Sequence, residues 1–211
     1  MNDDPVIDVK SGDLTSGDLS FLKSLVSEGP KAQATAGQVF MTAGILYGVQ
    51  CLLNWLGIVM KLNWSPLVWL LVGFGPTALF ILALVVIIWR GRGDQPQGVA
   101  ARALNAAYTS AGVANLFVVA VFGYNAMQEK SMVLWLLYPA VICIIQGSVW
   151  YVAFMIRRKP WLMAVSAGWF ASGLALGGLI HNISAYLLVL GVTLLVLMGG
   201  SGWYMLRTAQ K

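Results

Sequence analysis

Charged side chains are scarce in this chain. Only 10% of its 211 residues are charged, whereas 59% are hydrophobic, and the mean hydropathy is +0.77. Soluble globular domains carry roughly 25% charged residues. The shortage of charge therefore excludes an ordinary soluble domain and predicts an integral membrane protein whose main partner is the lipid bilayer.

No carboxylate lies inside a long apolar run. Six of the eight acidic residues precede Gly29, and the other two, Asp94 and Glu129, fall in polar segments between apolar runs. Pumps driven by protons or cations use acidic groups within the membrane. The sequence therefore argues against proton-coupled transport.

Histidine and cysteine are equally scarce. His181 is the only histidine, and Cys51 and Cys143 lie in separate apolar runs, where we interpret them as buried free thiols. A bis-histidine haem site or a common zinc site cannot be built from this set. The chain also shows no glycine-rich phosphate loop, serine elbow or Cys–His pair suited to catalysis. We therefore expect no metal, no cofactor and no enzymatic activity.

Long apolar runs dominate the rest of the chain. Each covers about twenty residues, which is enough to cross the roughly 30 Å hydrocarbon core as a helix. The runs span about 38–60, 66–89, 104–124, 132–156, 161–180 and 184–206. The fold prediction is an all-α polytopic membrane protein, a bundle of six transmembrane helices in antiparallel hairpins within residues 36–207.

The basic residues indicate an orientation. The net charge of +5 comes from short groups at the ends of runs rather than from one continuous face, so we expect no nucleic-acid partner. When the six runs alternate across the bilayer, eleven of the thirteen basic residues fall on one side, and only Lys61 and Lys130 on the other. Lysine and arginine favour the cytoplasmic side, which predicts that the N-terminal tail (1–35) and the C-terminus (208–211) are both cytoplasmic.

Aromatic residues near the ends of the runs are typical of the two membrane–water interfaces. We expect an outer belt and an inner belt, with Trp55 and Trp169 packed between helices instead. The outer belt would contain Trp64, Trp69, Tyr124, Trp135, Tyr138 and Tyr186, and the inner one Trp89, Trp150, Tyr151, Trp161, Trp203 and Tyr204.

The tail contains one amphipathic segment, at about residues 18–28. Apolar residues recur along one side of it at helical spacing, and Gly29-Pro30 ends it. Two interpretations remain open: this face docks on the protein's own helices, or it binds a separate cytosolic partner. The face consists of Leu19, Leu22, Leu25 and Val26, with Phe21 beside them.

A layer of neutral polar residues lies near the middle of the predicted spans, one on each helix. It consists of Gln50, Thr77, Asn115, Gln146, Ser172 and Thr193. One interpretation is structural, because polar side chains in membranes form hydrogen bonds between helices. The other is a small polar cavity that binds or conducts an uncharged solute.

Prolines and small residues modify the expected helices. Pro76, which follows Gly73 and Gly75, predicts a kink in the second span, and Pro139 predicts one in the fourth. Pairs of small residues four positions apart, such as Gly44 and Gly48, allow helix backbones to approach closely.

Several short stretches, taken together, resemble those of a known group of membrane proteins. They are Tyr138-Pro139-Ala140, then Gly147 and Trp150, then Arg157-Arg158-Lys159-Pro160-Trp161, and the tail segment DLSFLKSLVSEG. In these stretches the chain resembles small six-helix integral membrane proteins of Gram-negative bacteria that have no established activity. The resemblance implies the same topology and a bacterial inner (cytoplasmic) membrane, and it implies no catalytic residue.

The functional prediction follows from what is missing and what is present. We expect a non-enzymatic inner-membrane protein, an accessory or regulatory component that engages another protein, or a second copy of itself, through its tail or a small-residue helix face. The alternative is a carrier or channel for a small neutral solute through the mid-membrane polar layer. A membrane enzyme is the third hypothesis.

Overall fold

The computed structural model describes residues 30–91 and 98–209, with side chains from residue 33 onward. Six helices in these ranges are long and apolar enough to cross a membrane, which confirms the predicted all-α, six-helix architecture. The predicted amphipathic segment at about 18–28 lies outside the described residues. The first five helices are α2 (Pro30–Val59), α3 (Pro66–Arg90), α4 (Val99–Gln128), α5 (Met132–Arg157) and α6 (Pro160–Gly178). The sixth span is continuous through α7 (Ile183–Thr193), the π-helical turn η1 (Leu194–Gly200) and α8 (Ser201–Ala209).

Several helix starts follow from side-chain caps in the sequence. The hydroxyl of Ser65 accepts from the amide of Val68, the hydroxyl of Ser131 from that of Leu134, and the side chain of Asn182 from that of Ala185. The helices α2 and α4 are longer than the predicted runs, because α2 begins at Pro30 and α4 continues to Gln128. Apolar composition marks the hydrocarbon boundary, whereas hydrogen bonding continues a helix beyond it.

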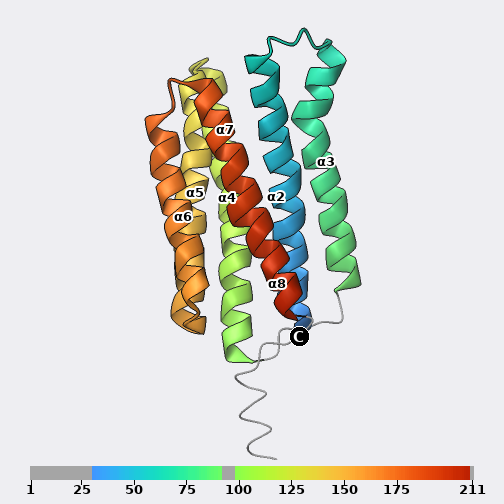
Figure 1. Ribbon diagram of the computed structural model, residues 1–211, viewed down its shortest axis with the longest axis vertical. Helices are drawn as coiled ribbons and strands as arrows, with labels where there is room; N and C mark the ends of the chain where they lie inside the picture. Colours follow the sequence, from blue (N-terminus) through green and yellow to red (C-terminus); the bar gives the residue numbers. More distant parts are fainter. Residues whose placement is uncertain (1–29, 92–97, 210–211) are drawn as a thin grey trace, which may run out of the picture.

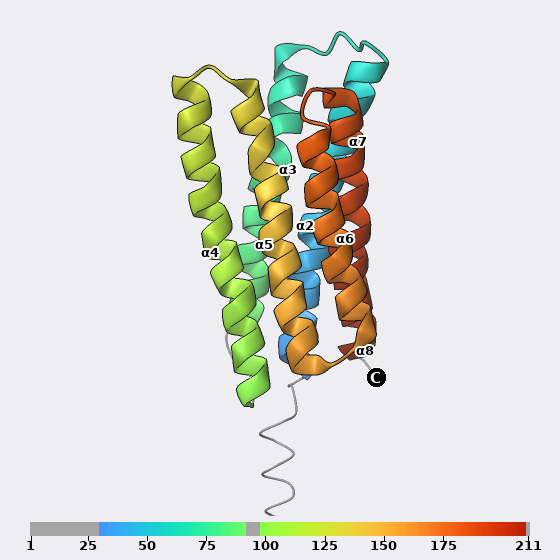
Figure 2. The ribbon, with the colours of Figure 1, turned by 90° about the vertical axis from the view of Figure 1, so that its left-hand side faces the viewer.

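The helices form a bundle with α2 and the sixth span in contact along its length (Figure 1). The helices α5 and α6 pack against each other, α4 packs mainly against α5, and α3 packs mainly against α2. Figure 2 shows α4 at one edge of the bundle, and Figure 1 shows α3 at another edge, on the far side of α2 from α5 and α6. Two helices are thus peripheral, and α3 contains no buried residue at all.

The start of α2 and the end of α8 lie at the same end of the bundle (Figure 1). We call this the basic end, because the described basic residues concentrate there. Lys61 and Lys130 lie at the opposite end, in the turns after α2 and α4. The basic end carries Arg90, Arg102, Arg157, Arg158, Lys159 and Arg207.

Glycines bring α2 and the sixth span into backbone contact. A Cβ atom at Gly44 would overlap the backbone of Gly199, lying 2.6 Å from its Cα. One at Gly202 would overlap Met41 and would lie 2.7 Å from the carbonyl oxygen of Gly37. This is the close approach that the small residues of α2 predict, and it includes the π-helical turn η1.

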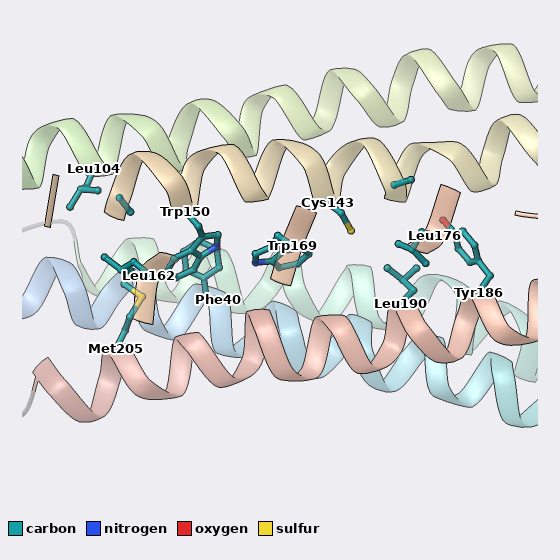
Figure 3. Close-up of a cluster of buried hydrophobic side chains, with 12 residues drawn as sticks. Phe40, Leu104, Cys143, Trp150, Leu162, Trp169, Leu176, Tyr186, Leu190 and Met205 are labelled. Atoms are coloured by element: carbon teal, nitrogen blue, oxygen red, sulfur yellow. The ribbon is translucent and has the colours of Figure 1, made fainter. Parts of the chain in front are cut away.

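Buried aromatic rings fill the core between the helices (Figure 3). Trp150 of α5 is 0% exposed, and its ring lies 5.3 Å from that of Phe40 on α2 and 5.9 Å from that of Trp161 on α6. The prediction that Trp150 and Tyr186 belong to interfacial belts is therefore wrong, since both side chains are in the core. Trp169 is buried between helices, as its position predicts. A residue's place along a span does not reveal whether its side chain faces lipid or a neighbouring helix.

Candidate functional site

The mid-membrane polar layer does not form one connected network in the described structure. Its clearest pair is Thr193 of α7 and Ser172 of α6, whose hydroxyl oxygens lie 3.0 Å apart, with Thr193 donating. A second bond between α5 and α6 involves a residue outside the predicted layer: buried Ser166 donates to the carbonyl oxygen of Gly147 at 2.8 Å. These contacts hold helices together, as the structural interpretation of the layer requires.

Gln50 is bonded to a peripheral helix rather than to the other amides of the layer. Its Nε2 donates to the backbone carbonyl oxygen of Gly73 in α3 at 2.8 Å. Thr77, the layer's residue on α3, is exposed on the outside of the bundle. Gln50 therefore joins α2 to α3 by a hydrogen bond, and the Thr77 side chain does not contribute to the core of the bundle.

Two carbonyl oxygens of the layer are buried without a hydrogen-bond partner among the described residues. They are Oε1 of Gln146 on α5 and Oδ1 of Asn115 on α4. The indole Nε1 atoms of Trp150 and Trp169 are also buried and without such a partner. An unpartnered buried polar atom costs roughly 1–3 kcal/mol, and internal water is the usual solution. This is the part of the layer with unused hydrogen-bonding capacity.

Both prolines inside helices have a side chain from a neighbouring helix bonded to the preceding turn. Gly73, whose carbonyl accepts from Gln50, is three residues before Pro76. The hydroxyl of Tyr186 donates to the carbonyl oxygen of Leu136, three residues before Pro139, at 2.5 Å. Proline has no N–H for the carbonyl four residues before it, and its ring crowds that carbonyl, which disturbs the preceding turn. Gly73 and Leu136 lie in that turn, one residue after the carbonyl that loses its amide partner. The predicted kinks at the two prolines stay predictions.

A cavity lies between α2 and α3 near the basic end. It measures about 630 Å³. Contacts between α2 and α3 lie at both ends of this cavity. At the end nearer the bilayer centre, the rings of Tyr47 and Phe80 are 5.5 Å apart. At the basic end, Gly91 approaches the side chain of Thr35. We call this space the α2–α3 cleft. Its lining residues are Ala34, Thr35, Gln38 and Thr42 of α2, with Leu82, Ala83, Val86, Ile87, Arg90 and Gly91 on the α3 side.

The two walls of the cleft differ in chemistry. The α2 wall carries Thr35, Gln38 and Thr42, which recur at spacings of three and four and so share one helix face. The α3 wall is apolar until Arg90, its last helical residue. This cleft was not predicted from the sequence. The signal was present as the polar stripe on α2, but the sequence does not show that α3 stands apart from it.

A second, much smaller cavity of about 30 Å³ also lies near the basic end. Its lining includes Gln33, Asn105, Tyr108 and Arg157, from three different helices. Neither cavity is lined by Gln50, Asn115 or Gln146. The solute-pathway interpretation requires a cavity touching at least two of these amides, and the cavities described here do not supply it.

Within residues 30–91 and 98–209, no group of three His, Cys, Asp or Glu side chains is placed to hold a metal ion. His181 is exposed in the turn between α6 and α7. Cys143 is buried, Cys51 is partly exposed, and both are free thiols. The predicted partner-binding face, Leu19, Leu22, Leu25 and Val26, precedes the described residues.

Comparison of the chain with protein-family models, with curated proteins and with solved structures returned no match.

Proposed function

We propose that this integral membrane protein is a non-enzymatic accessory or regulatory component that binds another membrane protein, or a second copy of itself, through α3. The observation that carries the proposal is the position of α3. It is 25 residues long, none of its residues is buried, and it packs mainly against α2. A helix held on one side only leaves most of its surface for other contacts.

The exposed surface of α3 has the chemistry of a helix-packing face at mid-depth. Gly73 and Thr77 are four residues apart and both exposed, and a Cβ atom at Gly73 would meet nothing within 4 Å. Small residues at this spacing allow a second helix to approach closely, and the Thr77 hydroxyl can donate across such an interface. Lipid alone requires neither a small residue nor a polar one there.

We also propose how the protein is oriented and in which membrane it lies. The basic end is the cytoplasmic end, because lysine and arginine near span ends favour that side, and the membrane is the bacterial inner membrane, as the resemblance implies. Reporter fusions at Arg158 and at Lys130 test the orientation. A reporter at Arg158 should be active in the cytoplasm and one at Lys130 outside it, and the reverse pattern would overturn this part of the proposal.

The binding test compares two glycines in open surroundings. Gly73→Leu adds bulk to the proposed interface, and Gly112→Leu adds the same bulk to the exposed face of α4, where a Cβ atom also meets nothing within 4 Å. The readout is the mass of the native particle after gentle extraction from its own membrane, with identification of what co-migrates. The wild type and Gly112→Leu should share one defined larger assembly, and Gly73→Leu should lose it. A lone monomer in all three would refute the proposal.

A carrier for a small neutral solute is the second candidate. It is favoured by the unpartnered oxygens of Asn115 and Gln146, which could accept hydrogen bonds from a solute or from water. Uptake of small neutral solutes into proteoliposomes tests it. A carrier should lose uptake in Gln146→Leu, whereas a wild type that takes up no more than empty liposomes would exclude this candidate.

A further inference from the structure

We propose that the α2–α3 cleft is a binding site for one anionic phospholipid. Arg90 holds the phosphate, and an acyl chain lies along the apolar wall of α3. This inference does not depend on the proposed protein partner, because the cleft is lined by α2 and the α2-facing side of α3. The depth of the cleft, the chemistry of its walls and the charge at its mouth all favour such a lipid.

The depth of the cleft matches one leaflet. Its lining extends along α3 from Gly91 back to Leu82, and along α2 from Ala34 to Thr42. At 1.5 Å per helical residue, these stretches correspond to about 12–14 Å along the helix axes. Half of the roughly 30 Å hydrocarbon core is about 15 Å. The cleft therefore begins at the interface at the basic end and reaches toward the bilayer centre, as a lipid molecule does.

The walls match the successive parts of a phospholipid. Leu82, Val86 and Ile87 provide an apolar wall for an acyl chain. Opposite them, the Gln38 amide and the Thr42 hydroxyl are hydrogen-bond donors. Gln38 is exposed, and its side chain makes no hydrogen bond to another described residue. Gln38 lies four residues from Ala34 at the mouth and can donate to an ester or glycerol oxygen, whereas Thr42 lies at the deep end, beside the acyl chain.

The charge at the mouth selects an anionic headgroup. The guanidinium of Arg90 is exposed and lines the cleft where it meets the interface. The one carboxylate in the described part of the chain is Glu129, at the opposite end of the bundle. Arginine binds phosphate through several N–H groups at once. A free phosphate ion would gain nothing from the apolar wall, so the whole phospholipid is the better fit.

The first experiment measures headgroup selectivity. The full-length protein is purified in mild detergent and titrated with phosphatidylglycerol or phosphatidylcholine, and bound lipid is counted by native mass spectrometry. The variant is Arg90→Gln, and the matched control is Lys159→Gln, which removes an exposed positive charge at the same end but outside the cleft. We expect one phosphatidylglycerol to bind in preference to phosphatidylcholine, and Arg90→Gln to weaken that preference about fivefold, the effect of one basic residue near an anionic lipid surface. Lys159→Gln should retain it.

The second experiment locates the lipid. Ala83→Phe places a ring in the cleft, and Ala171→Phe places the same ring on the exposed face of α6. A phosphatidylglycerol with a photoreactive acyl chain should label the peptides that contain Thr42 or Leu82 in the wild type and in Ala171→Phe, and this labelling should fall in Ala83→Phe. Because neither experiment depends on a functional assay, a folded protein is sufficient, and its monodispersity in detergent provides the check.

Four outcomes would overturn the assignment. Equal binding of the two lipids would remove the role of Arg90, and unchanged labelling in Ala83→Phe would place the lipid elsewhere. Displacement of phosphatidylglycerol by millimolar inorganic phosphate would show that the site recognises the free anion rather than the lipid. A fourth result, strong labelling only after removal of residues 1–29, would assign the cleft to the protein's own tail instead.

Discussion

The Nε2 atom of Gln50 donates to the carbonyl oxygen of Gly73 at 2.8 Å, and Gly73 is three residues before Pro76 in the neighbouring helix. The residue from the predicted polar layer thus stabilises the turn that proline disrupts. Tyr186 and Leu136 repeat the arrangement in front of Pro139. Each intrahelical proline is therefore coupled to a specific side chain of another helix.

This coupling predicts a non-additive pair of substitutions at Gln50 and Pro76. Gln50→Leu should lower the free energy of unfolding by about 0.6 kcal/mol, the average for an interhelical hydrogen bond in a membrane protein. In a Pro76→Ala background, the amide of residue 76 can bond to the carbonyl of Val72 and the turn relaxes. The Gly73 carbonyl in that turn then depends less on Gln50, and the same change should cost less. Unfolding in mixed micelles of all four variants gives the coupling energy, and simple additivity would contradict the pairing.

A similar expectation applies to Tyr186, whose hydroxyl is the donor to Leu136. Tyr186→Phe keeps the ring in the core and removes only the bond, so it should destabilise the bundle by about 0.6–1.7 kcal/mol. Tyr124→Phe is the control, because that ring is exposed and its hydroxyl only accepts an exposed hydrogen bond from Nε2 of Gln128 on the same helix. Equal effects of the two substitutions would show that the Tyr186 bond contributes nothing particular.

The contact between α2 and the sixth span makes Gly44 intolerant of a side chain. Gly44→Ala places a Cβ against the backbone of Gly199, which cannot move as a flexible side chain would. We expect a loss of about 1–3 kcal/mol in the free energy of unfolding, the usual cost of overpacking. Gly112→Ala, in open space on α4, should be neutral or stabilising by up to about 1 kcal/mol. The same order measured by thermal unfolding in detergent would support the packing, and the reverse order would refute it.

The turn after α4 contains a strained lysine. Lys130 has a φ angle of 48°, a left-handed conformation that favours glycine. Lys130→Gly should therefore raise the free energy of unfolding by about 1 kcal/mol, whereas Lys130→Ala removes the same charge and leaves the strain. Comparison of the two variants separates backbone strain from charge, and a stabilisation common to both would attribute the effect to charge.

Much of the architecture was predictable from the sequence, because the bilayer imposes simple rules. Long runs without charge must be helical, so their number and order follow from composition. The polar layer shows where prediction stops. Gln50, Ser172 and Thr193 do bond to neighbouring helices, but their partners were not predictable, since depth in the membrane does not fix the rotation of a helix about its axis. Trp150 and Tyr186 show the same limit. Their positions along the chain predicted a membrane interface, but the rotation of their helices places both side chains in the core.

The amino-acid sequence by itself determined the six helices, the concentration of basic residues at one end and the absence of an acidic group within the apolar runs. These features follow from the cost of placing charge and unbonded backbone in hydrocarbon, which acts on each segment separately. Only the tertiary structure decided that Gly44 meets Gly199, that α3 stands at the edge of the bundle and that a cleft opens beside Thr35, Gln38 and Thr42. Those features depend on which faces of different helices meet, and that choice is made by side-chain packing between segments far apart in the chain.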